Sequence, residues 1–261
     1  MVRRRTNVLA FFFLSLLFLS IYYFIHSPYF GVTKITVDGI NLLEEEEVIR
    51  LSGVRNGENL WRLDESRIQE QLFFHPHIKD VKVMRKWPSE VRLQIEERKP
   101  LAVIAQGASF VLLDSEGIYL KSIDSLRSFR IPVITGIEVT EASGPGQAFR
   151  DESISFALNV LMQFPPTLLL RIGELHVGVE SRLVLYTTEG IEIRFGVAEH
   201  TQEKGEVLQE ILNELALSGE TNKVRYINVS SPKAPAIKPK VGAQLHGIRS
   251  MGITIGDGIY D

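Results

Sequence analysis

Residues 81–96 read V-K-V-M-R-K-W-P-S-E-V-R-L-Q-I-E and contain two runs in which apolar and polar residues alternate. Alternation with a period of two is typical of a strand that has one buried face. The four residues between the runs, K-W-P-S at 86–89, include a proline and favour a turn. The sequence therefore predicts two strands joined by a turn, with Val83 and Leu93 facing the same core.

The residues before this pair of strands predict one further strand and two helices. Residues 32–37 alternate and end at an Asp-Gly turn. Residues 43–51 open with glutamates, which suit the positive end of a helix dipole. Leu60, Trp61 and Leu63 are expected to form a buried connector. Asp64, which follows, is a suitable N-cap for a second helix over residues 65–74. The order β-α-α-β-β predicts a small α+β unit with two helices on one face of a three-stranded mixed sheet.

The N-terminus carries a long apolar segment. Residues 8–25 read V-L-A-F-F-F-L-S-L-L-F-L-S-I-Y-Y-F-I, without a charge. A helix of that length spans about 27 Å, close to the hydrocarbon thickness of a bilayer. Three arginines precede it, so the positive-inside rule places residues 1–7 in the cytoplasm. A cleaved signal peptide and a buried core helix are alternatives, but the long apolar core without a small-residue cleavage site favours an uncleaved anchor.

Composition narrows the function classes. The chain has 261 residues, a formal net charge of −3 and no cysteine. A near-neutral charge does not favour nucleic acid as a partner. The part beyond the anchor is long enough for one or two domains, which must be held by packing without disulfides.

Three phrases within residues 30–102 carry a family resemblance. They are F-G-V-T-K-I-T-V-D-G at 30–39, V-I-R-L-S-G-V-R-N-G-E-N-L-W-R-L-D at 48–64, and R-K-x-P…I-x-E-R-x-P-x-A at 85–102. They resemble the POTRA domain of the bacterial division proteins FtsQ/DivIB, which also have an anchor in this orientation. The resemblance implies a transmembrane helix at residues 8–25 followed by a POTRA domain at residues 30–99.

The rest of the chain is similar to the larger β domain of that family, more in the order of its elements than in motifs. We expect this mixed or antiparallel β domain, with flanking helices, at residues 100–239. The remaining residues 240–261 are rich in glycine, and we expect a disordered tail there. Strands are predicted at 110–113, 118–120, 175–179, 183–187, 191–195 and 224–229, and helices around 154–161 and 207–215.

The resemblance also implies a partner site. In the family, the last strand of the β domain is an open edge, to which a segment of a coiled-coil partner adds. By order along the chain, residues 233–237 match this edge, although Ser230-Ser231 stands where the family often has Arg-Tyr. Alternatively, residues 230–239 simply begin the tail. The implied site residues are Tyr226, Ser230, Ser231, Lys233, Ala234, Pro235, Ala236 and Ile237.

A second candidate surface lies at the turn of the first strand pair. Arg85, Lys86 and Trp87 combine two cations with an aromatic ring. This group is either a solvated hairpin tip or a contact with a partner protein or with lipid headgroups.

No pattern in the sequence indicates catalysis. The motifs H-E-x-x-H and G-x-S-x-G are absent, and Gly256-Asp257-Gly258 lacks the strand and helix of a dinucleotide site. His75 and His77 flank a proline, but no third metal-ligand type clusters near them. We therefore expect no enzyme activity, no cofactor, no metal and no small-molecule substrate.

The resemblance implies a scaffold in the cytoplasmic (inner) membrane at the division site, with most of the chain outside the cytoplasm. It would bind single-span coiled-coil proteins similar to FtsB and FtsL, link early to late division proteins and control septal peptidoglycan synthesis. Two other classes are a POTRA-containing envelope assembly or translocation factor and a periplasmic enzyme on a signal anchor. Further POTRA units or a barrel would favour the assembly or translocation factor. A group of catalytic residues would favour the enzyme.

Overall fold

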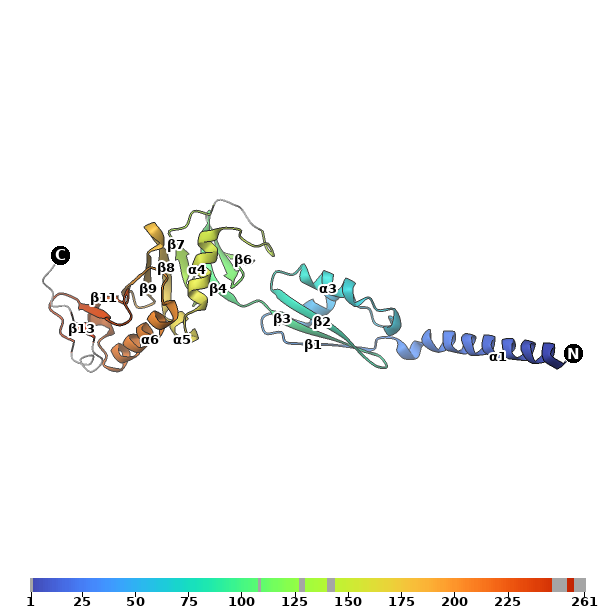
Figure 1. Cartoon of the computed structure of the whole chain (residues 1–261). Helices are drawn as coiled ribbons and strands as arrows, with labels where there is room; N and C mark the ends of the chain where they lie inside the picture. The colour runs from blue at the N-terminus through green and yellow to red at the C-terminus, as the bar shows by residue number, and fades with distance from the viewer. Residues whose placement is uncertain (1, 108, 127–129, 140–143, 246–252, 256–261) are drawn as a thin grey trace. The chain divides into compact units, whose positions relative to one another are not determined.

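The computed structural model describes residues 2–107, 109–126, 130–139, 144–245 and 253–255. The chain divides into two compact units, Met1–Arg98 and Lys99–Asp261 (Figure 1). The first unit combines a long helix with a small α+β fold, and the second is built on a large sheet. The α+β class with an N-terminal apolar helix, predicted from the sequence, is confirmed.

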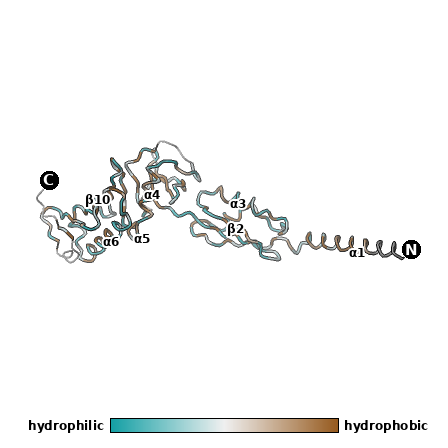
Figure 2. Tube along the Cα trace, in the orientation of Figure 1, coloured by the Kyte–Doolittle hydropathy of each residue, from teal (hydrophilic) through white to brown (hydrophobic). Residues whose placement is uncertain are grey.

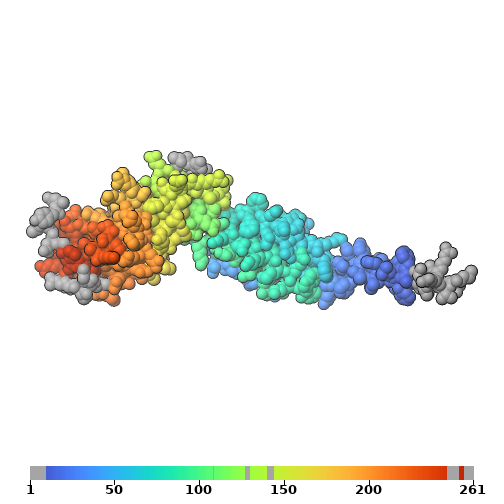
Figure 3. All heavy atoms as spheres, in the orientation of Figure 1, coloured from blue at the N-terminus to red at the C-terminus, as the bar shows by residue number. Residues whose placement is uncertain are grey.

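The long helix α1 (Val2–Ile25) opens the first unit, and Figure 2 shows hydrophobic colouring along it. The segment Ala10–Phe30 is long and apolar enough to cross a membrane, and none of its most apolar window is buried. Figure 3 shows the coloured part of α1 as a narrow projection from the rest of the first unit. The alternative of a buried core helix is therefore wrong, because no described part of the chain covers these side chains.

The remaining elements of the first unit form two layers. A sheet of order β1-β3-β2 carries two helices, with β1 parallel and β2 antiparallel to the central β3. Apolar side chains from the helices and from one sheet face form a single core. In chain order the elements are η1 (Pro28–Phe30), β1 (Lys34–Asp38), α2 (Glu45–Ser52), η2 (Leu60–Arg62), α3 (Glu65–Phe73), β2 (Ile78–Lys86) and β3 (Glu90–Glu97).

The local signals in the sequence act as expected in this unit. Val83 lies opposite Leu93 in the antiparallel register, and both side chains are buried. The Asp64 carboxylate caps α3 by accepting a hydrogen bond of 3.1 Å from the Arg67 N–H. Gly39 has φ +87°, and a Cβ there would collide with the Ile95 carbonyl oxygen, so the turn after β1 requires glycine.

The second unit has one ten-stranded sheet among its described residues, in the order β13-β12-β11-β10-β9-β8-β7-β4-β5-β6. It mixes parallel and antiparallel pairs and ends at β13 and β6, so it is an open sheet and not a barrel. Its elements are β4 (Pro100–Gln106), β5 (Ser109–Asp114), β6 (Tyr119–Ile123), β7 (Val133–Thr135), α4 (Glu152–Met162), α5 (Pro166–Leu169), β8 (Ile172–Val177), η3 (Val179–Ser181), β9 (Leu183–Thr187), β10 (Glu192–Gly196), α6 (Thr201–Leu217), η4 (Thr221–Lys223), β11 (Val224–Asn228), β12 (Ala236–Pro239) and β13 (Thr254–Ile255).

The main core of the second unit lies between the helices and one face of the sheet. The buried side chains of α4, α5 and α6 pack against the inward residues of the strands from β4 to β12. A smaller apolar cluster that includes Val103 and Leu112 lies on the opposite face of β4, β5 and β6. β4 and β5 are therefore buried on both faces over much of their length, whereas β6 has two exposed residues. The strands from β8 to β12 combine buried with partly exposed residues.

Three features differ from the sequence-based expectations. β4 begins at Pro100, where the sequence indicated only a boundary, because a strand buried on both faces does not alternate. Trp61, expected in a buried connector, is 47% exposed. Thr254–Ile255, expected in the disordered tail, form β13 on the edge of β12. Within that expected tail, residues 246–252 and 256–261 lie outside the described part of the chain.

Candidate functional site

The C-terminal edge of the large sheet is formed by β11, β12 and β13. β12 runs antiparallel to β11, with Tyr226 opposite Lys238 and Asn228 opposite Ala236. β13 is only two residues long and pairs with β12 in parallel. The Thr254 N–H donates a 3.1 Å hydrogen bond to the Pro235 carbonyl. β12 is thus paired with β11 along one side. On its other side, among the described residues, only the two residues of β13 pair with it.

The implied partner-site residues divide between this edge and the turn before it. Tyr226 lies on β11, and Ala236 and Ile237 lie on β12. The edge strand begins at Ala236 rather than at residue 233, because the preceding residues form a turn closed by the Ala234 N–H and the Ser231 carbonyl, 3.2 Å apart. This corrects the expected strand of residues 233–237. The turn contains Ser230, Ser231, Lys233, Ala234 and Pro235.

Ile237 does not offer its side chain to a partner. It is 0% exposed and belongs to the main core of the second unit. Only its backbone lies at the edge, where strand pairing uses N–H and C=O groups. The outward positions of β12 are Ala236 and Lys238, which alternate with Ile237 and are half-buried.

Two cationic side chains, Arg194 and Lys238, lie near the Tyr226 ring, and neither is among the site residues predicted from the sequence. The Arg194 guanidinium carbon lies 3.8 Å from the centre of the Tyr226 ring, and Lys238 Nζ lies 6.0 Å from it. Arg194 Nε also contacts Glu192 Oε1 at 2.9 Å. The register brings these residues together across three strands, so they could not be found from their separation in the sequence.

Ser230 and a buried lysine shape the backbone beside this edge. Ser230 donates to Asn228 Oδ1 through its N–H (3.0 Å) and its hydroxyl (2.7 Å). Lys204 is 1% exposed, and its Nζ donates to the carbonyls of Phe195 (3.2 Å) and Val197 (2.7 Å). Burial lowers the pKa of Lys204 below its usual range, with Glu199 acting in the opposite direction. Lys204 thereby fixes the connection from β10 to α6, a role that no sequence motif indicated.

The second candidate surface lies at the turn after β2, where Lys86 and Trp87 are exposed and Arg85 is half-buried. Arg85 donates from Nη2 to the Leu63 carbonyl (2.8 Å) and pairs with Glu65 (Nε to Oε1, 3.1 Å). Its guanidinium therefore already binds a backbone carbonyl and a carboxylate within the first unit. Lys86 and Trp87 are exposed, and the Trp87 ring lies 4.5 Å from that of Trp61, centre to centre. Trp87 therefore packs against Trp61, while Arg85, whose side chain is 31% exposed, contacts Leu63 and Glu65.

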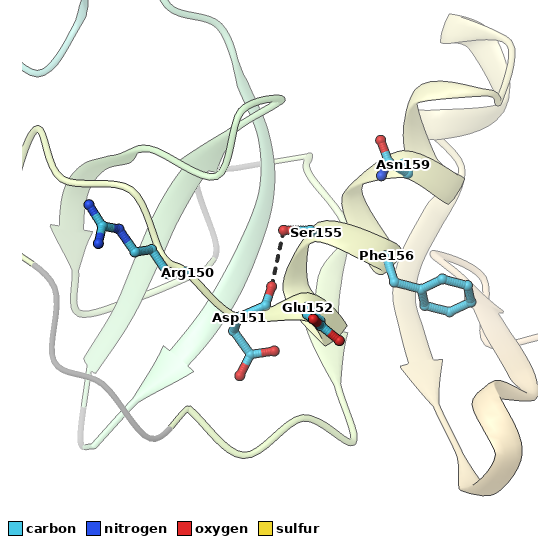
Figure 4. Close-up of a pocket in the computed structure, with 6 residues that line it drawn as sticks. All are labelled: Arg150, Asp151, Glu152, Ser155, Phe156 and Asn159. Carbon is cyan, nitrogen blue, oxygen red and sulfur yellow. Dashed lines mark hydrogen bonds between the residues drawn. The ribbon is translucent and has the colours of Figure 1, made fainter.

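A surface depression at the start of α4 has no catalytic geometry. A shallow, open pocket of about 500 Å³ lies at the start of α4, lined by Arg150, Asp151, Glu152, Ser155, Phe156 and Asn159 (Figure 4). The Asp151 carboxylate is used in capping, accepting from the N–H groups of Ser153 (2.7 Å) and Ile154 (3.2 Å). No group of three or more metal-ligating side chains occurs in the described residues.

Comparisons with known proteins agree with the two units. The family model "POTRA domain, FtsQ-type" matches residues 30–98, and the model "Cell division protein FtsQ/DivIB, C-terminal" matches residues 102–230. Cell division protein FtsQ of Anaeromyxobacter sp. (strain K) is 30% identical over 200 residues, covering 76% of this chain and 67% of the relative. FtsQ of Myxococcus fulvus is 27% identical over 216 residues, covering 81% and 75%. DivIB of Bacillus cytotoxicus is 28% identical over 187 residues, covering 69% of each.

Proposed function

The chain belongs to the FtsQ/DivIB family of bacterial cell division proteins, and on this premise we propose that it is a single-pass scaffold of the division machinery. In the proposal, α1 anchors the chain in the cytoplasmic membrane with its N-terminus in the cytoplasm. The two units outside the membrane bind other division proteins at the septum. The protein thereby links early to late components and controls septal peptidoglycan synthesis through contacts, with no catalytic step.

The observation that supports partner binding most is the edge of β12. An edge strand presents unpaired N–H and C=O groups, which a strand from another protein can satisfy. Among described residues, only the two-residue β13 pairs with this side of β12. The outward side chains of β11 and β12, Tyr226 and Lys238, lie beside it together with Arg194. We propose that a segment of a single-span coiled-coil division protein, similar to FtsB or FtsL, adds here and displaces β13.

The absence of cysteine makes this edge directly testable. Lys238→Cys places one thiol on β12, and Ser122→Cys places one on β6, the edge strand at the opposite end of the sheet. Each variant is labelled with a thiol-reactive photocrosslinker and irradiated in dividing cells. Strand addition predicts adducts of residue 238, but not of residue 122, with a single-span division protein. Equal adducts from both positions, or none from residue 238, would contradict the proposed site.

Truncation is a weaker test of the same site. Ending the chain after Val229 removes the fully buried Ile237 and therefore damages the core of the second unit. Ending it after Leu245 removes β13 but retains β12 and the buried Leu245. We expect the chain ending at Leu245 to bind the partner at least as tightly as the full chain, because no resident strand has to be displaced. Septal fluorescence of a tagged full-length chain tests the localisation separately.

A further inference from the structure

The two tryptophans of the chain form an exposed cluster at one end of the first unit. Trp61 lies in η2 and Trp87 in the turn after β2, yet their ring centres are 4.5 Å apart. Phe30, in η1, contacts both rings edge-on, at 5.9 Å from Trp61 and 5.8 Å from Trp87. Phe30 is buried beneath them, while the tryptophans are 47% and 48% exposed. We call Phe30, Trp61 and Trp87 the tryptophan tip.

The tryptophan tip is joined to the end of α1 by aromatic contacts and hydrogen bonds. The Phe24 ring of α1 packs edge-on against Phe30, with centres 5.1 Å apart. Asn59 Nδ2 donates a hydrogen bond of 2.8 Å to the Ile25 carbonyl. This carbonyl is one of those at a helix C-terminus that have no partner within the helix. Figure 1 shows the turn between β2 and β3 beside this end of α1.

His26 adds a second link between the helix end and the tip. Its Nδ1 donates to the Tyr22 carbonyl (2.8 Å), because that oxygen can only accept. Its Nε2 is then free to accept from Arg62 Nη2, at 2.7 Å. Arg62 follows Trp61 directly, so this bond also positions the tryptophan. The tip therefore lies at a defined height relative to the end of the helix.

That height coincides with the expected membrane surface. The apolar segment able to cross a bilayer ends at Phe30, the residue on which both tryptophans pack. Tryptophan is enriched at membrane–water interfaces because its ring is apolar and its indole N–H is polar. The exposed cations Arg62 and Lys86 lie next to the tryptophans in the sequence and can reach headgroup phosphates.

We propose that the tryptophan tip inserts into the headgroup layer of the membrane that α1 spans, so that the lipid surface is the partner of this face. The proposal rests on α1 acting as the membrane anchor. It is favoured over a protein partner by the continuity of the tip with the span. Its consequence is that α1 and the rest of the first unit share one depth and orientation at the membrane, instead of being joined by a free linker.

Intrinsic fluorescence tests the proposal, since the tip holds every tryptophan in the chain. The full-length protein is reconstituted in vesicles of phosphatidylcholine and phosphatidylglycerol whose acyl chains carry bromine either near the headgroup or at the distal end. Insertion predicts roughly twofold or greater quenching by bromine near the headgroup, and weaker quenching by distal bromine or aqueous iodide. Emission quenched by iodide and indifferent to brominated lipid would overturn the proposal.

Single-tryptophan variants make the comparison position-specific. Trp61→Phe and Trp87→Phe each leave one native reporter, and both should show quenching by bromine near the headgroup. The matched control combines these two substitutions with Tyr186→Trp, at a partly exposed position of β9 in the second unit. Residue 186 should be quenched by iodide and not by brominated lipid. If the native tryptophans behave like residue 186, the tip does not contact lipid.

Retention of the chain in the membrane distinguishes failure of the anchor from failure of the tryptophan tip. Vesicles are washed with alkaline carbonate, which removes peripheral proteins, and the pellet is analysed for the chain. Release of the chain would contradict both the anchor and the tip. Retention of the chain together with water-exposed tryptophans would contradict the tip alone and leave the anchor intact.

Discussion

At the scale of single residues, Glu97 shows how one side chain closes the first unit. It ends β3, and its carboxylate accepts hydrogen bonds of 2.9–3.0 Å from the N–H groups of Asn41, Leu42 and Leu43. Burial alone would raise the pKa of Glu97, but these bonds, with a smaller contribution from His77, hold it below its usual value of 4.5. The charged form is therefore the one that stabilises the fold.

Replacing Glu97 by glutamine should destabilise the first unit in a pH-dependent way. A buried N–H without a good acceptor costs about 1–3 kcal/mol, so we expect a loss of that size at pH 7 for Glu97→Gln. A group whose pKa is lowered by folding contributes its full stability above its unfolded value. The contribution of Glu97 is lost as the pH falls from about 4.5 through the lower folded value. The difference between wild type and variant should therefore narrow over that range in denaturant titrations.

Glu96 supplies the matched control for this prediction. Its side chain is 62% exposed and lies 3.7 Å from Lys79 Nζ, an arrangement worth about 0–1 kcal/mol. Glu96→Gln should change the unfolding free energy little at any pH. A difference for Glu97→Gln that stays constant down to pH 3 would show that the carboxylate charge does not carry the effect.

Contacts between residues that are far apart in the chain could not be predicted from the sequence. Glu97 stands in the phrase I-x-E-R that carries the family resemblance, but its hydrogen-bond partners are more than fifty residues earlier in the chain. Arg194, beside Tyr226, is likewise brought into the candidate site only by the pairing of β10 with β11. Caps such as Asp64 could be predicted because donor and acceptor are three residues apart.

At the scale of elements, the strand pair β2–β3 tests whether alternation specifies the buried face. Val83 and Leu93 lie opposite each other and face the helices, whereas Lys82 points to the other side and is exposed. An unpaired carboxylate at either buried position should cost at least about 3 kcal/mol, so Val83→Asp and Leu93→Asp should prevent stable folding of the first unit. Lys82→Asp should shift the unfolding midpoint only slightly. Similar destabilisation by all three variants would contradict this register.

Strands with one exposed face could be predicted from their pattern, and the others could not. β3 alternates, so the pattern predicts its bounds to within a residue or two, whereas β4 is a largely apolar run buried on both faces. β13 has no detectable signal, because two residues in a glycine-rich segment pair only where the edge of β12 offers free backbone groups. The predicted edge strand begins at residue 233, three residues before β12, because a proline in a turn and a proline in an edge strand look alike in the sequence.

At the scale of the whole molecule, each unit has its own core. The buried side chains of the first unit, from Val32 to Ile95, and those of the second, from Ala102 to Leu245, form separate clusters. Leu245 is buried, so the core of the second unit extends beyond residue 239, where the sequence predicts the end of the β domain. Neither unit contains cysteine, so each core must be stable through packing alone.

We therefore expect the chain from Tyr29 onward to fold without α1 and its two units to unfold separately. Both tryptophans lie in the first unit, so their fluorescence follows that unit alone, whereas far-ultraviolet circular dichroism follows both. Leu93→Asp, in the first core, should abolish the cooperative fluorescence transition and leave a dichroism transition from the second unit. Ile193→Asp, at a fully buried position of β10, should do the reverse and preserve the fluorescence transition. If either substitution shifts both signals by the same amount, the two units unfold as one cooperative body. A change of stability in the first unit would then also change the stability of the large sheet in the second.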